Sequence, residues 1–185
     1  MSKIITTREK YQKTIVPQLQ KELNLGNALM VPRVDKIVVN VGIGPLLKEK
    51  EAIKELKQAL IDITGQMPVM TTAKRSIASF KIREGQEIGM KITLRGTRMM
   101  HFMDRLINEA LPRTRDFQGI PMKAVDHNGN LNIGIKEHTI FPEISAENAR
   151  KIYGFQITIV SSTDNEESGE ALFRALGFPI QKEDH

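Results

Sequence analysis

The sequence predicts an α+β fold, in which residues 1–185 form a single domain with one largely antiparallel sheet and helices packed on one face of it. Segments that alternate apolar and polar residues predict strands with one buried side. Between them lie segments whose apolar residues recur at helical spacing, which predicts amphipathic helices. The chain is also long enough to bury a substantial core within one domain.

The first predicted element is an amphipathic helix at about residues 7–24. Its apolar stripe consists of Tyr11, Ile15, Leu19 and Leu23, which lie four residues apart. Pro17 lies inside this helix and should kink or split it, because proline lacks a backbone donor and crowds the preceding turn. The residues that follow, 24–33, have the composition of a loop.

Two segments alternate strictly between an apolar and a polar face, and each predicts a half-buried strand. In residues 35–44 the apolar face carries Ile37, Val39, Val41 and Ile43, and the opposite face is small and polar around Asn40 and Gly42. In residues 89–96, Lys91, Thr93 and Arg95 lie opposite Met90, Ile92 and Leu94. The small residues around Asn40 would let a ligand backbone approach closely, although a β-bulge or a solvated sheet face explains the pattern equally well.

Two further helices are predicted in the first two thirds of the chain. Residues 48–65 carry an apolar stripe with Glu/Lys pairs outside it, and Gly65 stands where a helix ends. A second helix begins after Thr97, a plausible N-cap, and ends before Pro112. Its methionines are more often core residues than the lining of a partner groove.

The last third of the chain is predicted to hold a hairpin turn at Asp126–Asn130, strands at about residues 131–138 and 155–162, and a helix at about residues 164–176. Ser162 or Thr163 is the expected cap of this C-terminal helix, and Gly177 is its stop. The helix is acidic on its outer side, so it should not face nucleic acid.

The strongest functional signal is the basic segment 70–98. It contains seven basic residues (Lys74, Arg75, Lys81, Arg83, Lys91, Arg95 and Arg98) against two acidic ones (Glu84 and Glu87). This charge favours a phosphate-bearing partner, as do the net charge of +5 and the pI near 9.5, although a solvated cationic face would look similar. A loop at about residues 73–89 should be exposed and mobile. Aromatic residues make up only 5% and tryptophan is absent, which argues against a platform that mainly stacks bases.

Several other classes of site find no support in the sequence. Without cysteine there is no thiolate metal site or cysteine nucleophile, and the composition suits a reducing compartment, with the cytoplasm as the default. No apolar stretch is long enough for a signal peptide or a membrane span. The Gly42-Ile43-Gly44 segment lacks the third glycine of a dinucleotide site, because Leu47 stands there. We therefore expect no enzyme activity, no metal and no cofactor.

Four stretches carry a resemblance to a known family: VPRVDKIVVNVGIG, TGQMPVMTTAKRSIASFKIREGQEIGMKITLRG, LPRTRDFQGI and NLNIGIKEHTIFPEI. In their order and spacing they resemble large-subunit ribosomal protein five, the bacterial 5S rRNA-binding family, from near residue 8 to about residue 180. The resemblance implies a protein of the central protuberance that binds 5S rRNA together with other 5S rRNA-binding ribosomal proteins. It also implies contacts with the large-subunit rRNA and peptidyl-site tRNA, and a bridge to protein thirteen of the small subunit.

The resemblance also implies site residues. Family positions that contact 5S rRNA match Asn40, Gln66, Phe80 and Thr93. Two of these, Asn40 and Thr93, are already assigned to open strand faces by the alternation, whereas Phe80 could equally be a core anchor. Candidates for phosphate contacts are Arg33, Lys36, Arg75, Lys91 and Arg95, and the stretch that resembles the tRNA-facing loop contains Lys81, Arg83, Glu84 and Gly85.

Two other classes of function remain open on the residues alone. An RNA-processing or nucleotide-using enzyme would turn over its substrate, but the broken glycine motif and the missing phosphate loop count against it. A protein-only adaptor would act through the acidic C-terminal helix and the methionine-bearing helix. Such an adaptor would bind its partner unchanged after nuclease treatment.

Overall fold

The computed structural model describes residues 10–47, 49–80, 82–115, 117–144 and 151–181. Five strands in these residues form one sheet: β1 (Val34–Gly42), β2 (Val69–Thr72), β3 (Glu87–Leu94), β4 (Leu131–Ile135) and β5 (Phe155–Ser161). Their order is β2-β3-β1-β5-β4, and every neighbouring pair is antiparallel. The predicted α+β fold with an antiparallel sheet is confirmed.

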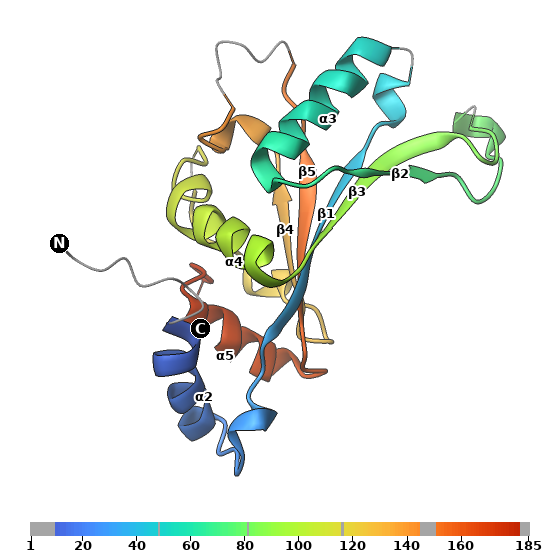
Figure 1. Cartoon of the computed structure of the whole chain (residues 1–185). Coiled ribbons are helices and arrows are strands. Elements are labelled where there is room, and N and C mark those ends of the chain that lie inside the picture. Colours follow the sequence, from blue (N-terminus) through green and yellow to red (C-terminus); the bar gives the residue numbers. More distant parts are fainter. Residues whose placement is uncertain (1–9, 48, 81, 116, 145–150, 182–185) are drawn as a thin grey trace.

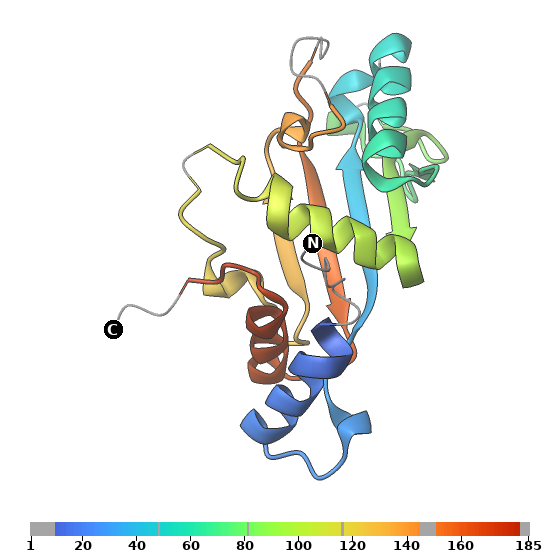
Figure 2. The same cartoon turned by 60° about the vertical axis from the view of Figure 1, so that its left-hand side comes forward.

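The helices α2 (Val16–Glu22), α3 (Lys50–Thr64), α4 (Gly96–Arg105) and α5 (Glu166–Leu176) lie on one side of the sheet (Figures 1 and 2). They cover the apolar strand faces that the alternation predicts, such as Val39 of β1 and Ile92 of β3, each 1% exposed. Three aromatic rings extend the same core, because Phe141 packs against Phe102 and Phe155 with ring centroids 5.9 Å apart in each pair. The described residues place no helix on the other face of the sheet, called here the open face.

Pro17 does not split the N-terminal helical segment, which is helical from residue 10 to Glu22, but the hydrogen-bonding pattern changes just before it. Residues Tyr11–Ile15 form a π-helical turn, and α2 begins at Val16, whose amide donates to the carbonyl of Tyr11. Because proline has no amide hydrogen, Pro17 cannot continue the π-helical hydrogen bonding that ends with Val16, and it lies in the first turn of α2. Residues 7–9 of the predicted helix lie outside the described residues.

Two predicted helix caps are wrong. Helix α4 begins at Gly96, and its N-cap is Arg95, which makes no side-chain capping bond, so Thr97 is already inside the helix. Helix α5 is capped by Asn165, whose side chain accepts from the amide of Glu167 at 3.1 Å. The hydroxyl of Thr163 instead accepts from the amide of Asn165 at 3.2 Å, so it fixes the turn before the helix. The predicted stop signals are confirmed, since Gly65 and Gly177 both have positive φ at the helix ends.

The β2–β3 hairpin projects beyond the helices as an arm (residues 69–90), at the right of Figure 1. Its connecting loop, residues 73–86, is exposed along most of its length but is internally hydrogen bonded. Ile77 and Ile82 exchange two backbone hydrogen bonds, and the amide of Ala73 donates to the carbonyl of Gln86 at 2.8 Å. The predicted exposure is confirmed for this loop, but residues 87–89 of the predicted loop 73–89 belong to β3, and the mobility stays a prediction.

Candidate nucleic-acid interface

The open face is a broad polar surface built from alternate residues of all five strands. Strand register places the following side chains on it: Val69 and Thr71 from β2, Gly89, Lys91 and Thr93 from β3, Lys36, Val38, Asn40 and Gly42 from β1, Gln156, Thr158 and Val160 from β5, and Asn132 and Gly134 from β4. Glu87, at the start of β3, follows the same alternation and places a carboxylate at the arm end of this face. The other residues supply amides, hydroxyls and cations, which suit a polyanionic partner.

The central row of the open face brings together residues from three strands. Asn40 pairs with Lys91 of β3 on one side and with Gln156 of β5 on the other. Asn40 and Lys91 are exposed, and neither side chain has a hydrogen bond or ion pair with another described residue. An amide and an ammonium group therefore lie side by side, free to bind an external ligand.

Gln66 occupies a supported position at the end of α3. Its side-chain amide donates to the carbonyl of Thr93 at 3.2 Å, so it joins the helix end to β3. Thr64, which is buried, accepts from the backbone amide of Gln66 at 3.3 Å. Gln66 and Thr93, both candidate site residues, are thus brought into contact. The hydroxyl of Thr93 lies on the open face.

The structure adds three polar residues that the sequence interpretation did not name. The hydroxyl of Thr158 donates to the side-chain oxygen of Asn132 at 2.7 Å, and the amide of Gln156 donates to the same oxygen at 3.5 Å. They extend the polar surface from β1 across β5 to β4. The alternation in FQITIVSS could have assigned Gln156 and Thr158 to an open face, because the apolar residues between them are buried.

Strand β4 is placed by the hairpin turn predicted at Asp126–Asn130. The carboxylate of Asp126 accepts from the amides of Asn128 and Asn130, at 3.0 and 2.8 Å. Burial acts to raise the pKa of Asp126, but hydrogen bonds from Asn130 and Asn128 outweigh it and hold the pKa below its usual value. The charged form of Asp126 therefore stabilises the turn that leads into β4.

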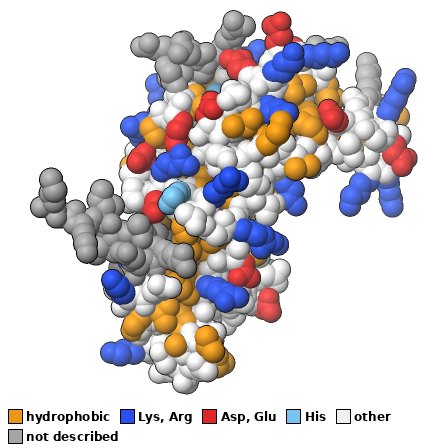
Figure 3. Space-filling view, viewed as in Figure 1, with side chains coloured by type: hydrophobic (Ala, Val, Ile, Leu, Met, Phe, Trp, Pro, Cys, Tyr) orange, Lys and Arg blue, Asp and Glu red, His pale blue; other side chains and the backbone are white. Residues whose placement is uncertain are grey.

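The predicted phosphate-binding cations lie at different places around the open face. Lys36 and Lys91 belong to its rows, and Arg95 comes directly after Leu94, the last residue of β3. Arg33 is exposed but forms an ion pair with Asp35 at 3.3 Å, which offsets part of its charge. Arg75 lies apart from this group, on the arm, where Lys and Arg side chains gather (Figure 3).

Phe80 lies on the arm and not in the core. Its side chain is 73% exposed in a short 3-10 turn, Ala78–Phe80, which excludes the alternative of a core anchor. Ile77 beside it is 45% exposed. The arm therefore carries apolar side chains among its cations, a combination that fits contact with a ribose or a base.

The predicted tRNA-facing stretch lies at the turn of the same loop. Arg83, Glu84 and Gly85 are exposed, and Gly85 has a φ of 78°, which favours glycine. The amide of Glu84 donates to the hydroxyl of Ser76 at 3.0 Å, and the amide of Gly85 donates to the carbonyl of Ala73 at 3.0 Å. Lys81 lies outside the described residues.

Glycines leave two exposed positions of the open face without side chains, Gly42 at the end of β1 and Gly134 in the row of Asn40 and Gln156. A Cβ placed on Gly42 or Gly134 would meet no atom within 4 Å, so both positions are open to an approaching ligand. Gly89, which pairs with Gly42, is different, because its Cβ would lie 2.7 Å from the hydroxyl of Thr71. A nucleic-acid backbone could approach β1 closely here.

The described residues contain no group of His, Asp and Glu side chains that could hold a metal ion. Within the same residues, no helix is long and apolar enough to cross a membrane. What the open face offers is hydrogen bonding and positive charge.

Comparison with known proteins identifies relatives along nearly the whole chain. The pattern of the family described as "Ribosomal protein L5" matches residues 27–83, and the pattern of the C-terminal part of the same ribosomal family matches residues 87–180. A "Large ribosomal subunit protein uL5" of Anaeromyxobacter sp. (strain Fw109-5) is 47% identical over 95% of this chain and 97% of its own length. A relative with the same description from Halothermothrix orenii is 47% identical over 94% of this chain and 97% of its own length. Another, from Streptococcus thermophilus, is 43% identical over 95% of this chain and 97% of its own length.

Proposed function

Because the chain belongs to the ribosomal protein L5 family of the large ribosomal subunit, we propose that its open face binds 5S rRNA and helps to attach it to the central protuberance. Family membership makes the chain a structural, non-enzymatic, RNA-binding component of the cytoplasmic ribosome, where rRNA is its partner in translation. What we propose beyond this is that the bound rRNA is 5S rRNA and that the residues named below hold it.

One observation carries the proposal: Asn40 and Lys91 are neighbours on the open face, and neither side chain bonds to another described residue. Lys91 would neutralise a phosphate, which contributes affinity but reads no sequence. Asn40 would donate and accept hydrogen bonds, as would the hydroxyl of Thr93 and the free side-chain oxygen of Gln66. These bonds would fix the register of a folded RNA element on the sheet.

The cations at the margins of the open face would extend the contact along the RNA backbone. Lys36 and Arg95 flank the central rows, while Arg33 would have to exchange its bond to Asp35 for a phosphate. Because phosphate contacts hold the RNA by its shape, the expected mechanism is shape recognition with a few hydrogen bonds that fix register.

The arm would serve a second set of partners. We propose that Phe80 and Arg75 also contact 5S rRNA, and that the turn with Arg83, Glu84 and Gly85 faces the peptidyl-site tRNA. An exposed aromatic ring stacked on a base is worth about 1–3 kcal/mol. The remaining family contacts, with large-subunit rRNA, other 5S rRNA-binding proteins and protein thirteen of the small subunit, are proposed for this chain without assigned residues.

The test is a titration of the purified protein with 5S rRNA, with transfer RNA as competitor, on the native chain and on Asn40→Ala. The substitution removes a hydrogen bond worth about 0.5–1.5 kcal/mol, so 5S rRNA affinity should fall about two- to tenfold. The melting temperature should stay the same, because the Asn40 side chain bonds to no other described residue. Equal binding of both RNAs, indifferent to Asn40, would leave only a generic basic surface.

Phe80→Ala and Phe80→Leu test the arm. If the ring stacks on RNA, alanine and leucine should both weaken 5S rRNA binding, because neither restores a π face. If leucine restores full binding, the contact is merely apolar. Since Phe80 is 73% exposed, neither change should lower the melting temperature, and a clear fall would contradict the described position of the ring.

A further inference from the structure

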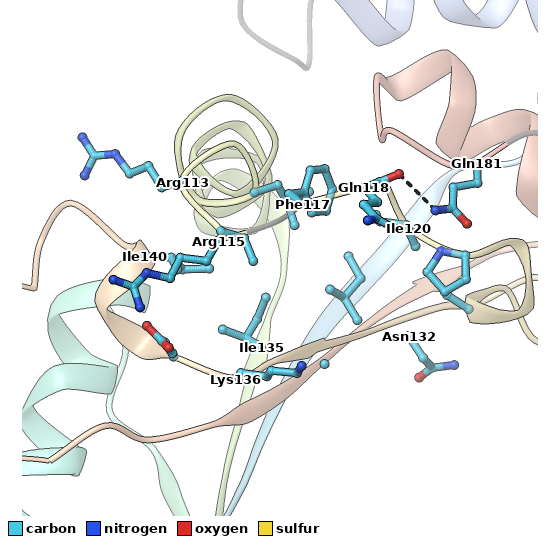
Figure 4. A pocket seen from close by; sticks show the side chains of 18 of the residues that line it. Arg113, Arg115, Phe117, Gln118, Ile120, Asn132, Ile135, Lys136, Ile140 and Gln181 are labelled. Atoms are coloured by element: carbon cyan, nitrogen blue, oxygen red, sulfur yellow. Dashed lines mark hydrogen bonds between the residues drawn. The ribbon is translucent and has the colours of Figure 1, made fainter.

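A cavity of about 930 Å³ lies along the outer edge of β4, away from the centre of the open face (Figure 4). One wall is β4 itself, from Asn132 to Ile135, with Lys136 following. The other wall comes from described residues of the segment after α4, namely Leu111, residues 113–115 and residues 117–121. The volume is in the range of sites that enclose a ligand.

The second wall is anchored away from β4, whose outer edge is bridged only at Leu131, to Val125, among the described residues. Ile120 donates to the carbonyl of Pro179 at 2.8 Å, and Gln181 donates to the carbonyl of Ile120 at 2.9 Å. The side chain of Gln181 also donates to the carbonyl of Gln118 at 3.0 Å (Figure 4). Among the described residues, no backbone hydrogen bond joins this wall to Asn132–Ile135.

The two sheet edges differ in how they are protected from an added strand. Strand β2 has four residues and a register shift at Thr71/Thr72, both of which discourage pairing. Strand β4 pairs with β5 in regular register over five residues, so its outer edge presents backbone groups at regular spacing after Leu131, which is bridged to Val125. It is the edge at which another strand could be added.

The cavity has an apolar side and a charged rim. Its apolar side chains are those of Leu111, Phe117, Ile120, Ile133, Ile135 and Ile140. Exposed Arg113, Arg115 and Lys136 stand at the rim with one carboxylate, that of Glu137. None of these three cations has an ion pair with a described residue.

We propose that the β4 edge binds an extended segment of another protein, in which apolar and acidic residues alternate. As an added strand, such a segment would hydrogen bond to β4, place its apolar residues beside Ile133 and Ile135, and turn its carboxylates toward Lys136 and the arginines. An RNA strand would satisfy the cations but would use neither the apolar side chains nor the row of strand amides. The observations therefore favour a peptide, and this inference is independent of the 5S rRNA proposal.

The probe is a fluorescent heptapeptide that alternates glutamate with valine and isoleucine, titrated against the RNA-free protein by anisotropy. The control peptide has the same composition, with its glutamates and its apolar residues in two separate blocks. Saturable binding of the alternating peptide alone is expected. Failure of the alternating peptide to bind, or equal binding of both peptides, overturns the proposal.

Protein variants locate the site. Arg113→Glu combined with Arg115→Glu should weaken peptide binding about tenfold or more, because like charges then face each other. Lys50→Glu combined with Lys54→Glu, two exposed changes on α3 with the same total change of charge, should have little effect. The two variants should have the same 5S rRNA affinity. A failure of the peptide proposal is therefore distinguishable from a failure of the 5S rRNA proposal.

Amide hydrogen exchange supplies a readout of strand addition itself. Bound peptide should slow exchange at alternate amides of β4, from Asn132 to Ile135, and leave β2 unchanged. Binding without protection of β4 would overturn strand addition. If a uridine oligonucleotide protects β4 and the peptide does not, the groove is an RNA site and the proposal fails.

Discussion

Lys91→Gln separates the charge of the open face from its shape. Lys91 is exposed in the central row, next to Asn40, and has no ion pair with a described residue. Its replacement should therefore change the free energy of unfolding by less than about 0.5 kcal/mol. If Lys91 neutralises one phosphate, its loss should reduce the slope of log affinity against log salt by about 0.9.

The assay is a series of 5S rRNA titrations from about 50 to about 200 mM salt. Over this fourfold range, a slope difference of about 0.9 reduces the ratio of native to variant affinity about 3.5-fold. Lys54→Gln, on the outer side of α3, is the matched control and should keep the native slope. The same slope for both variants, or an equal loss of affinity for Lys91→Gln at every salt concentration, would show that Lys91 neutralises no phosphate.

Three further predictions concern residues that support the open face or the core. Gln66→Ala removes the 3.2 Å bond to the carbonyl of Thr93 and should lower the free energy of unfolding by about 0.5–1.5 kcal/mol in urea titrations; unchanged stability would contradict a supporting role. Gly169→Ala places a Cβ 2.6 Å from backbone atoms of Gly129. The strain, about 1–3 kcal/mol, should exceed the gain in helix propensity, about 1 kcal/mol, so the melting temperature should fall. A melting temperature above that of the native chain would show that α5 can shift. Burial lowers the pKa of His138, so as the pH falls the unfolded chain binds a proton before the folded chain does. The contribution of His138 to stability should therefore be full above about pH 6.5 and should fall as the pH drops toward the lowered pKa of the folded chain. Thermal melts across this pH range should lose the dependence in His138→Gln.

The local patterns predicted the strands and their faces because each face is decided within one segment. Asn40, Lys91 and Thr93 alternate with residues that the structure buries, so their place on the open face could be read from β1 and β3 separately. The sequence did not show that Asn40 lies between Lys91 and Gln156, because register depends on pairing between segments more than 50 residues apart.

Caps and supporting bonds were harder to predict because several residues compete for the same role. Thr163 and Asn165 can both cap a helix, and the choice of Asn165 depends on where the chain leaves β5. The bond from Gln66 to Thr93 joins a helix end to a strand, which no local pattern encodes. Phe80 was ambiguous for a similar reason, since only the projection of the arm away from the helices decides that its ring is exposed.

The central claim is that RNA covers the open face of the sheet and not the helices. The chain has no cysteine, so single cysteines can be introduced at Gln156 on the open face and at Lys54 on α3, both exposed positions. The measurement is the rate of maleimide alkylation of each thiol with and without saturating 5S rRNA. The account predicts strong protection of Gln156→Cys and none of Lys54→Cys, whereas protection of Lys54→Cys alone would contradict it.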